Sequence, residues 1–133
     1  MNFELMKIER CEEMDAWKAA RGPSNMIYEV TTGGMFARDY ALKEQIRRAA
    51  VSTLSNLAEG FERGGNREFL QFLAIAKGSC GEVRAQLYVA LDQSYISQEQ
   101  WGIINNKTIE VSRLISGFIR YLQQSEMRGS KYK

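Results

Sequence analysis

The chain has 133 residues, of which 44% are hydrophobic and 26% are charged, values typical of one soluble globular domain. One proline and eleven glycines exclude a long disordered linker, and a formal net charge of +2 is too small to indicate nucleic-acid binding by itself. The complete absence of histidine excludes the commonest general base, the commonest metal ligand and every Ser-His or Cys-His nucleophile pair.

Other motifs that carry chemistry are missing as well. Cys11 and Cys80 have no repeated spacing, so they predict neither a disulfide framework nor a Cys-x-x-Cys metal site. The stretch ERGGNRE lacks the lysine and the spacing of a P-loop. The N-terminal stretch does not have the pattern of a signal peptide, and no segment approaches the roughly 18 uncharged apolar residues of a membrane span. We therefore expect a cytoplasmic protein with no metal or other cofactor, and not an enzyme.

Apolar residues recur at helical spacing through nearly the whole chain, and no segment alternates as a strand does. Met14 and Trp17 indicate a first helix near residues 12–32, which ends at a Thr-Thr-Gly-Gly stretch. Pro23 lies inside this range and either kinks the helix or starts it. We favour a kink, because Trp17 needs a surface to pack against.

Two further helices are expected near residues 41–63 and 67–93, separated by an Arg-Gly-Gly-Asn stretch. Their apolar positions follow spacings of three and four residues, the pattern of helices that pack nearly antiparallel in a bundle. The expected core positions are Ile46, Ala50, Leu54, Leu57 and Phe61 in the second helix, and Phe69, Leu73, Ala76, Cys80, Val83, Leu87 and Ala90 in the third.

A fourth helix is expected near residues 98–125, with Ser97 and Gln100 forming a capping box at its start. Its expected core positions are Trp101, Ile104, Thr108, Val111, Ile115, Phe118 and Leu122. Residues 126–133 are expected to be a basic flexible tail, whose cationic side chains either contact phosphates or stay solvated. Because the loops are short, sequential helices should be antiparallel. The sequence therefore predicts an all-α, up-down-up-down antiparallel four-helix bundle that forms a single domain over residues 1–133.

The outward sides of the second and third helices carry little charge. Between residues 69 and 91 only Lys77, Glu82 and Arg84 are charged, and Gly78 and Gly81 lower the helix propensity. A weakly polar surface of this kind often marks a protein contact, although small residues can also leave a smooth, wet surface. The expected interface between copies of the chain comprises Val51, Ser55, Ala58, Leu70, Ala74, Gly78, Gly81, Ala85 and Tyr88.

A polar stripe follows the second helix and faces a matching flank of the third. If these helices are antiparallel about a connection near Gly65, Ser52 meets Ser79 and Arg48 meets Glu82. We interpret the stripe as a structural polar seam that a neighbouring copy can share; the alternative is a groove for a ligand or a nucleic acid. The stripe comprises Arg48, Ser52, Asn56, Glu59, Arg63, Ser79, Glu82 and Gln86.

These segments resemble a known bacterial family. The chain carries Gln-Ile-Arg-Arg-Ala at 45–49, Asn-Leu-Ala-Glu-Gly at 56–60, Glu-Phe at 68–69, Gly-Ser at 78–79 and Gln-Leu at 86–87. This order is similar to the pattern of the four helix bundle protein family, whose founding members are encoded by intervening sequences in 23S ribosomal RNA genes. The resemblance spans roughly residues 15–122, with departures at Pro23, Gly81 and Arg84.

The resemblance implies a homopentameric ring of four-helix bundles and no known enzyme activity. Distant relatives are accessory subunits of diversity-generating retroelements, where a basic bundle pentamer works with a reverse transcriptase and RNA. We therefore expect a non-enzymatic, RNA-associated homo-oligomer. Its candidate phosphate contacts are Arg47, Arg67, Lys107, Arg113, Arg120, Arg128, Lys131 and Lys133.

Two alternatives remain. The first is a protein-binding scaffold, or an accessory subunit of a nucleic-acid enzyme such as a reverse transcriptase. The second is an enzyme that uses Glu59 and Glu82 as a carboxylate pair, although the Glu-x-x-His motif of bundle metal sites is impossible without histidine.

Overall fold

A computed structural model describes residues 8–131 of the chain, with side chains for residues 8–125. Every regular element of this part is helical. The confirmed all-α fold consists of a 3-10 helix η2 (Cys11–Glu13) and the α-helices α1 (Asp15–Val30), α2 (Gly34–Arg38), α3 (Tyr40–Arg63), α4 (Asn66–Asp92) and α5 (Gln98–Lys131).

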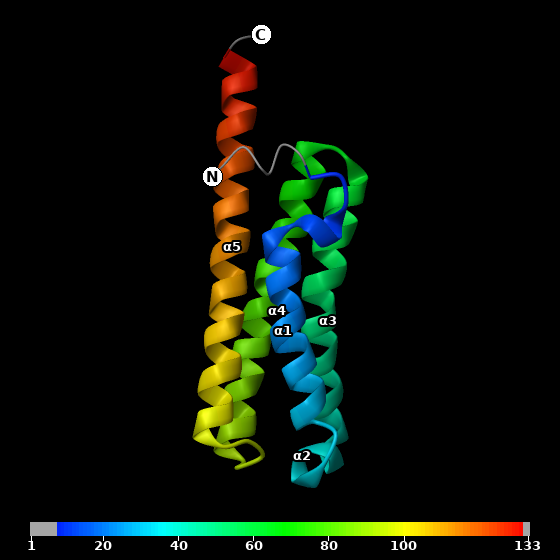
Figure 1. Ribbon diagram of the computed structural model, residues 1–133, viewed down its shortest axis with the longest axis vertical. Helices are drawn as coiled ribbons and strands as arrows, with labels where there is room; N and C mark the ends of the chain where they lie inside the picture. The colour runs from blue at the N-terminus through cyan, green and yellow to red at the C-terminus, as the bar shows by residue number, and fades with distance from the viewer. Residues whose placement is uncertain (1–7, 132–133) are drawn as a thin grey trace.

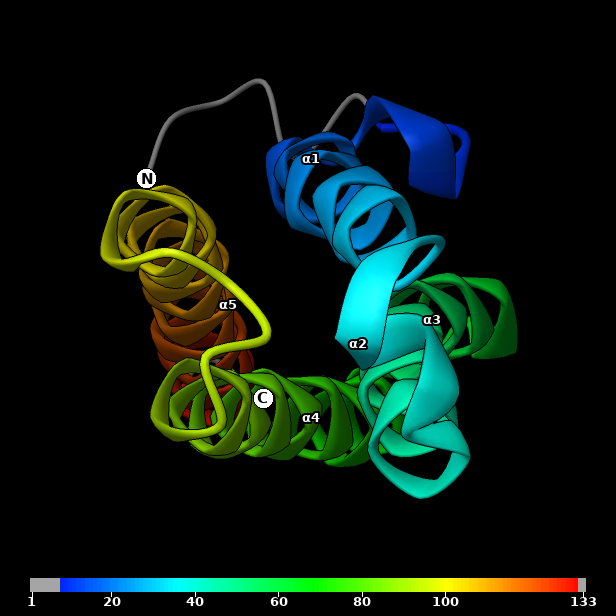
Figure 2. The ribbon, with the colours of Figure 1, turned by 90° about the horizontal axis from the view of Figure 1, so that it is seen from below.

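The long helices α1, α3, α4 and α5 lie side by side, and the short α2 lies at one end of the bundle (Figure 1). Seen along the bundle, α4 lies between α3 and α5, and α1 occupies the remaining side (Figure 2). Helix α1 packs against both α3 and α5. The last part of α5 extends beyond the other helices (Figure 1). The outer surfaces of α3 and α4 are therefore adjacent and open to contact.

The expected helix boundaries agree with the structure within three residues everywhere except at the C-terminal end. There α5 continues to Lys131, so the backbone of residues 126–131 is helical and the helix is longer than expected. The side chains of Arg128 and Lys131 lie outside the described side chains, and Lys133 lies outside the described residues.

Local side-chain chemistry explains where α3 and α5 begin. The Asp39 carboxylate accepts a 3.1 Å hydrogen bond from the backbone N–H of Leu42 at the start of α3. At the start of α5, Gln100 accepts from the Ser97 N–H at 2.9 Å and donates its own N–H to the Ser97 hydroxyl at 3.0 Å. The predicted capping box is therefore confirmed.

Helix α3 ends at Gly64, whose φ of 79° lies in the left-handed region that glycine adopts without a side-chain penalty. Helix α4 begins at Asn66, so the connection between the two helices is very short. This turn brings α4 back along α3 and fixes which residues of the two helices face each other.

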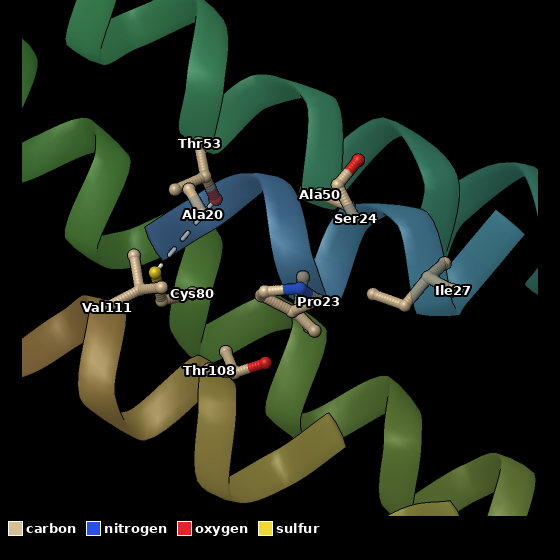
Figure 3. A pocket seen from close by; sticks show the side chains of 10 residues that line it. Ala20, Pro23, Ser24, Ile27, Ala50, Thr53, Cys80, Thr108 and Val111 are labelled. Atoms are coloured by element: carbon tan, nitrogen blue, oxygen red, sulfur yellow. Dashed lines mark hydrogen bonds between the residues drawn. The ribbon is translucent and has the colours of Figure 1, made fainter. Parts of the chain in front are cut away.

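Pro23 is buried inside α1, so the alternative that the first helix begins at this proline is wrong. Because proline has no N–H, the carbonyl of Ala19 loses its helical hydrogen bond. A void of about 10 Å³ lies beside Pro23, among Thr53, Cys80 and Thr108 (Figure 3). That volume is about the smallest that can hold one water molecule, so the void is a packing defect rather than a ligand pocket.

The predicted heptad seams form the core. Apart from the half-buried Leu54, Phe61 and Trp101, all the expected core positions of α3, α4 and α5 are buried. The core divides into one cluster around Leu57 and Leu73 and another around Ile46, Leu87 and Ile104. None of the described helices has a stretch apolar and long enough to cross a membrane.

Candidate functional site

A small polar network lies at the middle of the α3–α4 interface. The hydroxyl oxygens of Ser52 and Ser79 are 2.9 Å apart, as the antiparallel register predicts. The Asn56 amide donates to the carbonyl oxygen of Ser52 at 2.8 Å and to its hydroxyl at 3.0 Å. Ser79 is only 3% exposed, because the contact between the helices removes it from water. Its bond to Ser52 therefore satisfies a buried hydroxyl. The predicted meeting of Ser52 and Ser79 is therefore confirmed.

The expected contact between Arg48 and Glu82 is wrong as an ion pair. Arg48 instead lies 4.0 Å from Glu44, one turn earlier on its own helix, and both side chains are largely exposed. Arg48 and Glu82 line the same open groove of about 440 Å³, together with Gln45, Ser52 and other residues of α3 and α4. Long side chains at a wet groove gain little from crossing it, because water screens the attraction and ordering them costs entropy.

Gln86 occupies the α4 wall of the same groove. Its side-chain oxygen Oε1 is buried and has no hydrogen-bond donor among the described residues. A buried carbonyl without a donor is unfavourable, so this wall of the groove is incompletely satisfied in the single chain.

At the far end of the stripe, Arg63 forms a surface cluster. Its Nη2 donates to Glu59 at 2.9 Å, its Nη1 lies 3.9 Å from Glu68, and its guanidinium lies 5.4 Å from the centre of the Phe72 ring. Of the two carboxylates considered as a catalytic pair, Glu59 is paired with Arg63, whereas Glu82 lines the groove beside Arg48. The described residues contain no group of three or more acidic or cysteine side chains arranged to hold a metal ion.

Arg47 is not the exposed, free cation that was expected. It is half-buried: its Nε donates to the Thr31 hydroxyl at 2.8 Å, and its guanidinium carbon lies 4.3 Å from the centre of the Tyr28 ring. Tyr28 and Arg47 line a second open groove of about 450 Å³ between α1 and α3, which also includes Arg48 and Val51. This groove was not predicted, because the position of α1 against α3 cannot be inferred from one helix at a time.

The other candidate phosphate contacts with described side chains are exposed, as expected. Arg113 and Arg120 are seven residues apart on α5 and therefore share one stripe. Lys107 lies about a third of a turn from that stripe, and Arg67 belongs to α4. The structure gathers these side chains into no single patch around one groove.

The expected interface residues lie mostly on the surface. Val51 and Tyr88 are 41% and 48% exposed, whereas Ala58 and Leu70 are half-buried. The Tyr88 ring packs at 5.0 Å from Trp101 of α5, so only part of it is available. The remaining expected interface residues are exposed: Ser55, Ala74, Gly78, Gly81 and Ala85.

The sequence interpretation missed two larger apolar side chains on the same helix. Ile75 is 52% exposed and Val89 is 45% exposed. Their spacing from Gly78 and Ala85, at three and four residues, could have indicated that all four share one face of α4. The exposed face is therefore more apolar than predicted.

Gly78 and Gly81 have no packing reason within the chain. A Cβ atom added at either position would meet nothing within 4 Å, and neither residue has a positive φ. Each nevertheless makes the helix less favourable by about 1 kcal/mol relative to alanine.

The Cys80 thiol and the Tyr95 hydroxyl make contacts within the fold. Burial raises the pKa of the Cys80 thiol, whose closest polar partner is the Thr53 hydroxyl at 3.9 Å, so this cysteine is a poor nucleophile. The Tyr95 hydroxyl donates to the Asp39 carboxylate at 2.9 Å, and that bond raises the pKa of the Tyr95 phenol. The Tyr95 bond ties the loop before α5 to the start of α3.

The comparisons with known proteins agree with this architecture. A crystal structure of a protein of unknown function from the S23 ribosomal protein family of Bacteroides thetaiotaomicron VPI-5482 has a similar fold, with a TM-score of 0.72. The two proteins are 22% identical, over 78% of this chain and 97% of the other. A comparison with curated proteins finds no match. The family model described as "23S rRNA-intervening sequence protein" matches residues 12–117. Because this match covers most of the chain, the protein belongs to the 23S rRNA-intervening sequence protein family.

Proposed function

We propose that this protein is a non-enzymatic homo-oligomer that associates with RNA in the cytoplasm. In the proposed assembly, up-down-up-down antiparallel four-helix bundles form a ring, which the family resemblance implies is a pentamer. The observation that carries the proposal is the weakly polar outer face of α3 and α4, whose composition suits contact with another copy.

The outer face of α4 supports self-association most directly. Ile75 and Val89 are about half exposed, and Gly78 and Ala85 between them carry almost no side chain. Small side chains let a second helix approach closely, which would compensate for the helix propensity that Gly78 and Gly81 lose. On α3, Val51 is another apolar side chain that is 41% exposed.

Self-association is tested by placing a charge in this face. Ala85→Glu adds a carboxylate to an exposed position and should leave the fold of the single chain unchanged. If copies pack here, light scattering should show a smaller particle for Ala85→Glu than for the wild type, because burying an unpaired charge is unfavourable. Gln123→Glu, at an exposed position near the end of α5, is the matched control and should keep the wild-type mass. Equal masses for all three proteins would reject this face as the interface.

The proposal of an RNA partner rests on the family and on exposed cations. The family name refers to 23S rRNA, and the solved relative belongs to a family named after a ribosomal protein. Arg67, Lys107, Arg113 and Arg120 are exposed and available for phosphate contacts. In a ring each copy would repeat these charges, so the assembly would offer several sites where one chain offers few.

Binding to a ribosomal RNA fragment should weaken steeply as salt rises, because each phosphate contact releases counterions. Fluorescence anisotropy between about 50 and 200 mM salt measures this dependence. Undetectable binding at the lowest salt, or binding that salt does not change, would reject phosphate-mediated association.

A second candidate function is a scaffold or an accessory subunit for a nucleic-acid enzyme such as a reverse transcriptase. The net charge of only +2 favours it, because a protein that binds RNA alone usually carries a stronger positive field. The test is a pull-down from a nuclease-treated lysate. Recovery of a polymerase without nucleic acid would support the second candidate over the first, and loss of all partners after nuclease treatment would reject it.

A further inference from the structure

Arg47 is held in place before any ligand binds. Its Nε donates to the Thr31 hydroxyl at 2.8 Å, and Thr31, which is fully buried, donates in turn to the Ile27 carbonyl at 2.7 Å. Its Nη2 makes a longer contact of 3.5 Å with the Tyr28 carbonyl, and the guanidinium stacks on the Tyr28 ring at 4.3 Å. A planar guanidinium fixed on an aromatic ring loses little further freedom on binding.

Arg47 lines the groove between α1 and α3 and keeps donors that no described residue engages. Among the residues that the structure describes, no hydrogen bond or ion pair engages its Nη1. Arg48 lines the same groove of about 450 Å³ and is restrained only by a 4.0 Å contact with Glu44. Ser52 and Ser55 line it too, but the Ser52 hydroxyl is already bonded to Ser79 and Asn56. Two guanidinium groups and the Ser55 hydroxyl therefore line the groove, together with the Glu44 carboxylate.

We propose that this groove binds a phosphate group. Guanidinium forks bind carboxylates and phosphates alike, but a planar carboxylate is satisfied by one fork. Two forks and the Ser55 hydroxyl offer more donors than one planar carboxylate can use, whereas the oxygens of a tetrahedral phosphate can accept from all of them. The phosphate can come from free phosphate or from an RNA backbone, and in the second case the inference rests on the proposed RNA association.

The groove also borders the proposed contact between copies, because Val51 and Ser55 line it. Phosphate binding and self-association would therefore be linked at this place. The mass of each variant below is measured in parallel, so that a change of assembly is not mistaken for a change of affinity.

The first test uses the full chain and inorganic phosphate. In NMR spectra the Arg47 Nε–H signal should shift saturably with phosphate and not with chloride at equal ionic strength. Arg47→Lys keeps the charge but loses the fork and the stacking, and should weaken binding about tenfold. Arg48→Gln, at a side chain that is 83% exposed, should weaken binding similarly without affecting the fold. Arg84→Gln removes the same charge from an exposed position on α4 outside the groove residues, and should bind like the wild type.

Equal shifts with phosphate and chloride would overturn the proposal. So would equal losses for Arg48→Gln and Arg84→Gln, because binding would then depend on net charge rather than on this groove.

The second test replaces phosphate by a single-stranded RNA oligonucleotide. If the groove holds a backbone phosphate, Arg48→Gln should weaken RNA binding more than Arg84→Gln, and free phosphate should compete. RNA binding that both variants affect equally would overturn the groove as the RNA site but leave the RNA association standing. Phosphate binding that depends on Arg47 and Arg48, with no RNA binding at low salt, would support the groove and reject the RNA association.

Discussion

The α3–α4 interface has two ends that differ in kind. Near the turn, Gly60 of α3 lies so close to α4 that an added Cβ would be 2.7 Å from the Cβ of Phe72 and 2.9 Å from the ring of Phe69. Further along, the same two helices leave an open groove of about 440 Å³ between Arg48 and Glu82. The Ser52–Ser79 bond lies between the two ends.

The comparison shows what each kind of residue does at a helix contact. The glycine permits close approach of two aromatic side chains, so that end is tightly packed. Long charged side chains hold the other end open and wet. The closed end stabilises the single chain, and we infer that the open end is the part that partners use.

The sharpest test of the closed end is Gly60→Ala. The new methyl group must displace Phe72 or Phe69, so the free energy of unfolding should fall by about 2 kcal/mol even though alanine is the better helix former. Chemical denaturation at a fixed protein concentration measures the change. An unchanged or increased stability would mean that the two helices separate easily at Gly60. The closed end would then not be more tightly packed than the open end.

Removing the Ser52–Ser79 bond at the middle of the interface should lower the free energy of unfolding by less than Gly60→Ala does. Ser79→Ala removes the bond between Ser52 and Ser79, leaves the Ser52 hydroxyl with Asn56 alone, and should lower the free energy of unfolding by about 1 kcal/mol. The double variant Ser52→Ala/Ser79→Ala removes both groups and should lose less than the sum of the single changes. Strict additivity would indicate that the 2.9 Å bond makes no coupled contribution.

On the outer face of α4, a change of glycine to alanine should raise the free energy of unfolding, whereas Gly60→Ala should lower it. Gly78→Ala meets no atom within 4 Å in the single chain and should raise the free energy of unfolding by about 0.5–1 kcal/mol at concentrations where the chain is monomeric. Where copies associate, the added methyl group should reduce the gain. A loss of stability in the dilute monomer would show that the face is packed within the chain.

The smallest change in the free energy of unfolding is expected at the open end of the α3–α4 interface. Arg48→Gln removes only an exposed, 4.0 Å contact with Glu44, so the stability should change by less than about 0.5 kcal/mol. The same thermal or chemical unfolding experiment measures it. A larger loss would mean that Arg48 supports the fold rather than a partner.

The sequence predicted the parts of this fold that depend on local rules. Heptad spacing placed Leu73 and Ile115 in the core, and the short turn at Gly64 fixed the register that joins Ser52 to Ser79. Register alone did not predict the partner of Arg48, because a flexible exposed side chain takes the nearer Glu44 on its own helix.

Contacts that depend on the rotation of one helix against another could not be predicted from the sequence. Arg47 meets Tyr28 and Thr31 of another segment, and Tyr95 meets Asp39 across 56 residues. No spacing within a single helix encodes such pairs, so the groove of Arg47 emerged only from the structure.

In the proposed assembly, other copies cover the outer face of α3 and α4. Light scattering of the wild-type chain at micromolar concentration is the decisive measurement. We expect a particle whose mass is a multiple of 15.2 kDa, with five copies for a pentameric ring. A stable particle of 15.2 kDa across that concentration range, with Ile75 and Val89 remaining in water, would contradict it.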